Sequence, residues 1–87
     1  MKDPDDYIRS EVVGVLRKIL DPESVPILLE ALNDVNYVVR IRAAETLGFL
    51  RDPRAVEPLN RALRDVNRDV RNTARLALEQ VEGRDVR

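Results

Sequence analysis

The chain repeats its own sequence every 31 residues, and this period constrains its fold more than any other feature. Residues 6–36 and 37–67 are identical at eleven positions without a gap, and a shorter third copy covers residues 68–81. Within the first two copies, Asp21-Pro22 recurs as Asp52-Pro53. Self-similarity of this kind indicates stacked copies of one supersecondary unit, because a single copy cannot bury its own apolar face. Such arrays offer an extended surface, so the period favours binding over chemistry.

Four residues are placed to cap the starts of helices. The side chains of aspartate and asparagine accept hydrogen bonds from the unpaired amides of a first helical turn. Pro22 and Pro53 each follow such a residue at the first helical position, where the missing amide hydrogen would be unpaired anyway. Helices are therefore expected to begin near residues 22 and 53. The capping residues are Asp21, Asn36, Asp52 and Asn67.

Apolar residues spaced by three and four positions predict three equivalent helices, which we call the inner helices. Two further amphipathic segments of about a dozen residues lie between them and predict outer helices. Each outer segment contains a proline, Pro26 or Pro58, which is expected to kink it. The stripes predicted to form the core are Ile8, Val12, Leu16 and Ile19; Val39, Ala43, Leu47 and Leu50; and Val70, Ala74, Leu78 and Val81.

These elements together predict an all-α fold of five helices. Connections of about two to four residues force neighbouring helices to lie antiparallel, so the pairs stack into a right-handed α-solenoid. We expect one domain over residues 1–87, with a partial first repeat from residue 7. Residues 1–6 are too few for an outer helix, which leaves one flank of the first inner helix uncovered. Gly83 suits a left-handed helix cap, and residues 84–87 are expected to fray.

The charge balance excludes several classes of partner. The chain has 16 acidic and 15 basic residues and a formal net charge of −1. Four arginines gather near the last two inner helices, but phosphate backbones attract a net basic surface, so nucleic acid is not expected as a partner. No apolar run is long enough for a membrane span or a secretory signal, so we expect no membrane contact and a cytoplasmic location. The four arginines are Arg42, Arg68, Arg71 and Arg75.

The chain contains neither histidine nor cysteine. The commonest general base, the commonest nitrogen ligand for metals and the best protein nucleophile are therefore missing from its chemistry. We expect no catalytic residues, no metal site and no cofactor, and hence a protein that is not an enzyme.

The second copy resembles a known repeat family. It is similar to the short HEAT-like repeats first noted in phycobilisome lyase subunits, and the resemblance implies a HEAT-like α-solenoid along nearly the whole chain. In the first copy Val12-Val13 replaces a pair of small residues and Arg17 replaces a glycine, so the resemblance is weaker there. The residues that carry it are Val39-Arg40, Ala43-Ala44, Leu47-Gly48 and the run Asp52-Pro53-Arg54-Ala55-Val56-Glu57-Pro58-Leu59.

The same resemblance bears on chemistry. A related HEAT-like hydroxylase, which modifies a lysine on a translation factor, binds its metals through histidine–glutamate pairs. This sequence cannot supply such pairs, so the relationship is not expected to extend to that enzyme.

The resemblance also implies a structural ladder along the stack. In such repeats an aspartate in the loop before an inner helix and an arginine at the start of that helix often form a ladder that runs between neighbouring repeats. Because an aspartate accompanies every arginine, we interpret the row as an ion-pair network and not as an anion site. The matching positions are Asp3, Asp34 and Asp65 with Arg9, Arg40 and Arg71.

Apolar residues on a second face of the inner helices suggest a binding surface. On the predicted helix 37–50, a rotation of 100° per residue places Ile41 and Glu45 almost opposite the core stripe. In the family this side lines the concave groove, and aromatic groups such as Tyr37 and Phe49 suit interfaces. The residues predicted to bind a partner are Tyr7, Tyr37, Val38, Ile41, Arg42, Glu45, Phe49, Asp69, Asn72 and Leu76.

We therefore interpret the chain as an interaction scaffold for a protein, helix or peptide. The uncovered first helix offers a second interface, either to an outer helix in a longer parent protein or to another copy of the chain. A homo-oligomer is expected to form through this helix or through the concave face. Two alternatives stay open: a module of a phycobilin lyase-like protein, and a designed or excised minimal repeat scaffold without a natural client.

Overall fold

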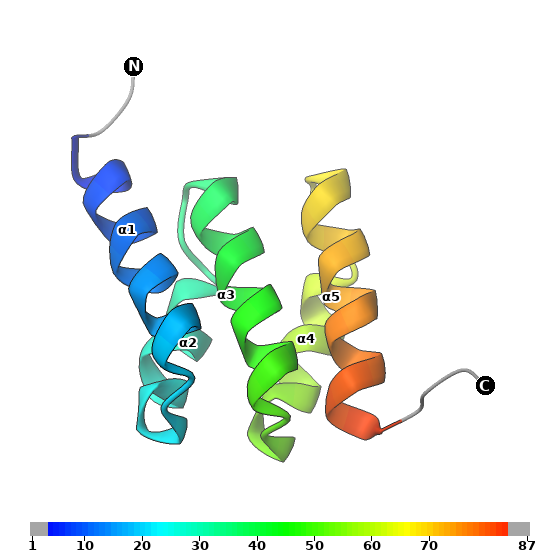
Figure 1. The fold of residues 1–87 in the computed structure, drawn as a ribbon. Helices are drawn as coiled ribbons and strands as arrows, with labels where there is room; N and C mark the ends of the chain where they lie inside the picture. The colour runs from blue at the N-terminus through cyan, green and yellow to red at the C-terminus, as the bar shows by residue number, and fades with distance from the viewer. Residues whose placement is uncertain (1–3, 84–87) are drawn as a thin grey trace.

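The computed structural model describes residues 4–83, with side chains from Asp5 onward. This part of the chain is helical and contains no strand, which confirms the predicted all-α solenoid of five helices (Figure 1). The predicted ladder residue Asp3 and the predicted tail 84–87 lie outside the described residues. The α-helices are α1 (Pro4–Ile19), α2 (Val25–Ala31), α3 (Tyr37–Leu50), α4 (Val56–Ala62) and α5 (Arg68–Glu82), with 3₁₀ turns η1 (Pro22–Ser24) and η2 (Pro53–Ala55).

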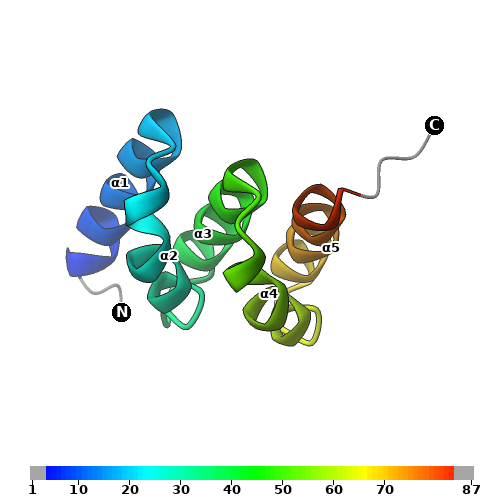
Figure 2. The ribbon, with the colours of Figure 1, turned by 90° about the horizontal axis from the view of Figure 1, so that it is seen from below.

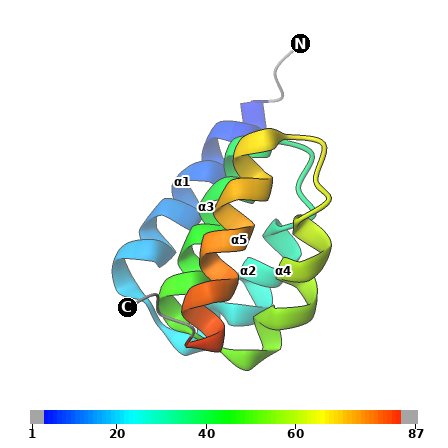
Figure 3. The same ribbon diagram turned by 90° about the vertical axis from the view of Figure 1, so that its right-hand side faces the viewer.

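The helices form two layers. The inner helices α1, α3 and α5 lie side by side, and α2 and α4 form a second layer behind them (Figures 1 and 2). Figure 3 views the stack from its C-terminal end, with α5 in front of α3 and α1. Each outer helix packs against the inner helix that follows it, α2 on α3 and α4 on α5. The helix α1 therefore has no outer helix of its own among residues 4–83.

The predicted caps explain where the inner helices begin and end. Asn36 accepts hydrogen bonds from the second and third amides of α3 at 2.8 and 3.4 Å, and Asn67 does the same for α5 at 2.8 and 3.1 Å. At the other end of α5, Gly83 adopts a left-handed conformation with φ of 68°, as predicted. Local hydrogen bonding thus fixes the helix boundaries independently of the core.

The outer elements differ from the prediction in one respect. Asp21 and Asp52 cap them as expected, but each starts with a 3₁₀ turn and becomes a seven-residue α-helix only afterwards. Pro26 and Pro58 consequently fall in the first turn of α2 and α4, directly after the switch from 3₁₀ to α geometry. Each proline therefore stands at the start of an outer α-helix and not in its interior, where a kink was expected.

The core lies between the two layers and between successive inner helices. Many of its members are alanines, which let helices approach closely, and both layers supply larger buried side chains such as Leu28, Leu47 and Leu59. The buried apolar residues are Val13, Val25, Leu28, Leu32, Val39, Ala43, Ala44, Leu47, Ala55, Leu59, Ala62, Val70, Ala74, Ala77 and Leu78.

The predicted core stripe of the first inner helix is wrong at three of its four positions, and only Leu16 packs against the core. Ile8, Val12 and Ile19 are exposed, and α1 buries Ser10 and Val13 instead. The reason is that the equivalent stripes on α3 and α5 are covered by the preceding repeat, and α1 has no such repeat among the described residues. The apolar spacing does form one face of α1, but that face is buried only where a preceding repeat covers it.

The closest helix contact is made possible by a glycine. A Cβ added to Gly48 of α3 would lie 2.9 Å from the Cα of Ala77 on α5 and would also collide with the Gln80 side-chain oxygen. By contrast, a Cβ on Gly14 of α1 would meet only Nη1 of Arg42, at 3.5 Å. Gly48 is therefore needed for packing, whereas Gly14 is not.

We expect Gly48→Ala to lower the free energy of unfolding by about 1–3 kcal/mol, because the backbone of α5 must move to admit the methyl group. The matched control Gly14→Ala adds the same methyl group in ordinary van der Waals contact with Arg42 and should leave stability unchanged or raise it by up to about 1 kcal/mol. Urea unfolding followed by circular dichroism measures both. Equal effects of the two substitutions would contradict the packing role of Gly48.

Candidate protein-binding face

The loops between repeats are tied to the inner helices by arginine–aspartate pairs. Arg9 of α1 donates to both carboxylate oxygens of Asp34, with Nη2 at 3.0 Å from Oδ1, and its guanidinium also contacts Asp6. Arg40 of α3 donates to Asp65 in the same bidentate way, at 2.8 and 3.0 Å. Since each of these aspartates precedes the next inner helix, the bonds join consecutive repeats.

Arg40 and its equivalent in α5, Arg71, also hold the loop before their own helix. Arg40 donates from Nη1 to the carbonyl oxygen of Asp34 at 2.8 Å, and Arg71 donates to that of Asp65 at 2.8 Å. Among residues 4–83, Arg71 donates only to backbone oxygens, those of Asp65 and Val66. The pairs Arg9–Asp34 and Arg40–Asp65 therefore account for the two complete steps of this ladder in the described chain.

The carboxylate of Asp34 stays ionised because of its neighbours. Partial burial alone would raise its pKa, but hydrogen bonds from Arg9 and from the Asn36 amide, with the charges of Arg9 and Arg40, lower the pKa below its ordinary value. The same contact raises the pKa of Arg9. The ladder thus pairs Arg9 and Arg40 with carboxylates inside the stack, which leaves these two arginines little free charge for an anionic ligand.

The predicted binding residues lie on α1, α3 and α5. We call the outward side of this layer, which faces the viewer in Figure 1, the inner-helix face. Tyr7 is 71% exposed, Leu76 53%, Tyr37 48% and Phe49 41%. Ile41 differs, because it is half-buried and packs against the core. The remaining predicted residues are half-buried (Val38, Arg42 and Glu45) or exposed (Asp69 and Asn72).

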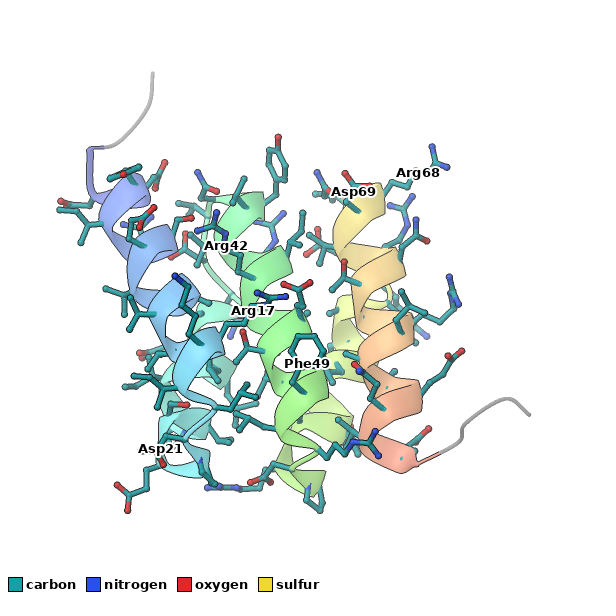
Figure 4. All side chains as sticks on the ribbon, in the orientation of Figure 1. Arg17, Asp21, Arg42, Phe49, Arg68 and Asp69 are labelled. Carbon is teal, nitrogen blue, oxygen red and sulfur yellow. The ribbon has the colours of Figure 1, made fainter. Side chains whose placement is uncertain are left out.

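A polar hollow adjoins Phe49 between α1 and α3. Arg17 reaches across from α1, where its Nε lies 3.0 Å from a carboxylate oxygen of Glu45 and its guanidinium lies 5.3 Å from the centre of the Phe49 ring (Figure 4). Arg42 reaches back from α3 and donates to the carbonyl oxygen of Ser10 at 2.9 Å. The open space measures about 450 Å³ and is lined by Glu11, Gly14, Val15, Arg17, Lys18, Arg42 and Glu45.

Sequence reasoning missed Arg17 as a member of this site, although a signal was present. Arg17 occupies the position that Gly48 holds one repeat later. A long charged side chain at a position reserved for close helix contact indicates that α1 and α3 cannot approach each other as α3 and α5 do. The hollow is the consequence of that exchange.

The described side chains do not provide a metal centre. Between residues 4 and 83 no three histidine, cysteine or acidic residues gather where they could hold one ion. The aspartates at the loops serve arginines and helix caps instead, as Asp34 and Asp52 do.

Stacked helix pairs joined by a loop ladder define an α-solenoid repeat protein. The family profile described as HEAT repeats matches residues 1–79, so the chain belongs to the HEAT-repeat family. None of the helices between residues 4 and 83 combines the length and the apolar character needed to cross a bilayer.

Two curated relatives are similar to part of the chain. A deoxyhypusine hydroxylase of Emericella nidulans is 48% identical over 52 residues, and one of Aspergillus clavatus is 46% identical over 52 residues. In both cases the match covers 58% of this chain and 16% of the relative. The chain thus corresponds to a small part of each relative's length.

These relatives correct two expectations. The expectation that the protein is not an enzyme is contradicted, since both relatives, similar over part of the chain, are named as enzymes. The missing histidines also did not exclude a relationship to the hydroxylase. The physical reason is that similarity between repeats arises from the residues that pack the helices together. A missing residue type limits the chemistry only of the segment that lacks it. The relatives also give no support to the narrower phycobilisome-lyase type, because neither is named as a lyase.

We expect Arg40→Ala to lower the free energy of unfolding by about 2 kcal/mol more than Arg71→Ala. Both arginines hold a loop through backbone oxygens, but Arg40 also binds the largely buried carboxylate of Asp65, which the substitution would leave without its partner. Urea unfolding of the two variants measures the difference. If both variants lose the same stability, the carboxylate step of the ladder contributes nothing.

We expect the stability of the protein to fall in acid partly through Asp34. Its pKa is lower in the folded protein than in the unfolded chain, so its contribution is complete above the unfolded pKa, about 4, and is lost as the pH falls toward the folded value. In Asp34→Asn this contribution is absent at every pH. Unfolding free energies from pH 6 to pH 2 should therefore decline less steeply for the variant than for the wild type, and parallel profiles would contradict this assignment.

Proposed function

We propose that this HEAT-repeat protein binds a helix or peptide of a partner protein through the inner-helix face. The observation that carries the proposal is the exposure of Tyr37, Phe49 and Leu76 on helices that already bury a full stripe on their other side. An exposed aromatic and aliphatic centre on ordered helices is typical of an interface. A cytoplasmic location is part of this proposal.

The rigidity of the face supports binding without a large entropy cost. Asn caps fix the ends of α3 and α5, and the pairs Arg9–Asp34 and Arg40–Asp65 fix the loops between repeats. A partner therefore meets side chains already held in place, and only the partner has to become ordered. The apolar centre would supply the affinity.

The hollow beside Phe49 would set the orientation of the partner. Arg17 and Glu45 are paired with each other at the surface, and exposed pairs of this kind exchange partners at little cost. Lys18 and Glu11 add one charge of each sign to the same hollow. A partner with an apolar anchor and mixed flanking charges suits this surface better than a polyanion does.

The similarity to deoxyhypusine hydroxylases supports a second candidate. In this role the chain would form part of the repeat scaffold of such an enzyme, and the inner-helix face would contact the protein that carries deoxyhypusine. Support comes from the identities of 48% and 46% over 52 residues. A peptide containing deoxyhypusine, titrated beside the same peptide with lysine, tests this candidate: preferential binding supports it and equal affinity opposes it.

Peptide selection against the folded protein tests the main proposal. A displayed library of helical peptides would be selected on the wild type, and the affinities of recovered peptides measured by fluorescence anisotropy. Phe49→Ala combined with Leu76→Ala should weaken binding at least about tenfold, because large exposed anchors carry most of the energy of such contacts. These two side chains are chosen over Ile41, whose loss would also disturb the core.

The control removes equally apolar surface elsewhere. Val35 and Val66 lie in the loops before α3 and α5 and are 84% and 92% exposed. Val35→Ala combined with Val66→Ala should leave peptide affinity unchanged. Peptides that bind the Phe49 and Leu76 variant as tightly as the wild type would overturn the assignment of this face.

A further inference from the structure

Four aliphatic side chains lie exposed along one side of α1. Ile8, Val12, Val15 and Ile19 expose 58%, 47%, 52% and 61% of their surface. Their spacing of four, three and four residues places them on one face of the helix, which we call the open stripe. A stripe with this spacing is the surface by which one helix packs against another.

The same positions are covered in the other two inner helices. A shift of 31 residues converts the open stripe into Val39, Ala43, Thr46 and Leu50 on α3, and a second shift gives Val70, Ala74, Ala77 and Val81 on α5. All of these side chains are buried except Leu50 and Val81, which are half-buried. In the interior of the stack this face always receives the preceding repeat, so on α1 it is a contact face.

An apolar hollow of about 210 Å³ lies beside the open stripe. It is formed by Ile8 and Val12 together with Ile27 of α2, which is 53% exposed. Its charged rim consists of Arg9, Glu30 and Asp34. The hollow is large enough for an aliphatic side chain from whatever covers α1.

The opposite end of the stack cannot fill this role. The positions on α5 that would face a following repeat are Asn72, Arg75 and Glu79, which correspond to Ile41, Ala44 and Gly48 on α3. They are polar, and Arg75 lies 3.7 Å from Glu79 in an exposed ion pair. A polar end caps a solenoid against stacking, so head-to-tail association would press these charges against aliphatic groups.

We propose that the open stripe packs against the open stripe of a second copy of this chain, with the two α1 helices antiparallel about a twofold axis. The spacing four, three, four reads the same in both directions, so Ile8 faces the second copy's Ile19 while Val12 faces its Val15. This self-complementarity is what a closed twofold dimer requires. The side chains that follow Ile19 in each copy then reach the apolar hollow beside Ile8 and Val12 of the other copy.

The charges beside the stripe match the same arrangement. Glu11 and Lys18 lie two helical turns apart on the flank that adjoins α3, and both line the hollow there with Val15. In an antiparallel pair the Glu11 of each copy lies within about a helical turn of the Lys18 of the other.

The mass in solution and three sets of variants test the proposal. The chain of 10.0 kDa should sediment with about twice that mass at high concentration and dissociate on dilution. Val12→Glu should shift the protein to monomer, whereas Val66→Glu in the exposed loop before α5 should not. A wild type that stays monomeric up to millimolar concentration would overturn the proposal, as would a dimer that Val12→Glu leaves intact.

Charge exchange tests the pairing without disturbing the fold. Glu11→Lys and Lys18→Glu should each weaken the dimer by several-fold, and the double exchange should restore it. Failure of the double exchange to restore what the single ones remove would overturn the antiparallel arrangement.

Disulfide trapping tests the orientation. Because the chain has no cysteine, Ile8→Cys mixed with Ile19→Cys should form a disulfide between copies on oxidation, and Ile8→Cys alone should not. Cross-linking of Ile8→Cys to itself would overturn the antiparallel arrangement. Dissociation of the dimer by the Phe49 and Leu76 variant would place the contact on the inner-helix face and overturn it as well, which separates this proposal from the proposed function.

Discussion

Every inner helix of this fold depends on the repeat before it to cover its aliphatic stripe. The helix α3 is covered by α1 and α2, and α5 is covered by α3 and α4. Each repeat therefore buries the stripe of the repeat that follows it. As a result, the same repeat position is exposed in the first copy and buried in the later copies. Val12 is exposed, whereas its equivalents Ala43 and Ala74 are completely buried. Among the described residues this leaves the aliphatic stripe of α1 uncovered, and an uncovered apolar stripe is a surface that can bind a partner.

The sequence predicts well whatever depends on local interactions. Helical spacing and capping depend on residues close together in the chain. The order of the helices and the caps at Asn36, Asn67 and Gly83 could therefore be predicted from the sequence. The start of each outer element was predicted, but its 3₁₀ turn was not, because proline and aspartate suit the first turn of either helix type. Whether such a turn is 3₁₀ or α depends on how it packs against neighbouring helices, and the identity of one residue does not determine that packing.

What the sequence could not supply is the tertiary environment of each stripe. Ile8 and Val39 look alike in a helical projection, and only the presence or absence of a covering repeat distinguishes them. The inner-helix face shows the same limit: Phe49 and Ile41 were grouped together, but Ile41 packs against the core while Phe49 remains exposed. One difference between the repeats indicated the charged hollow, namely Arg17 at the position where the next repeat has a glycine. Its effect depends on the distance between α1 and α3, which the sequence does not give.

The helix α1 belongs to both binding surfaces, and this shared position connects them. Val15 lies on the open stripe and also lines the hollow beside Phe49, and Arg17 crosses that hollow to Glu45. Since α1 contacts α3 without the glycine-mediated approach seen between α3 and α5, long side chains such as Arg17 span the space between these two helices. If a contact at the open stripe displaces α1, the width of the hollow changes with it. In that case linkage requires reciprocity: the factor by which the contact changes the affinity of a ligand in the hollow is the factor by which that ligand changes the affinity at the open stripe.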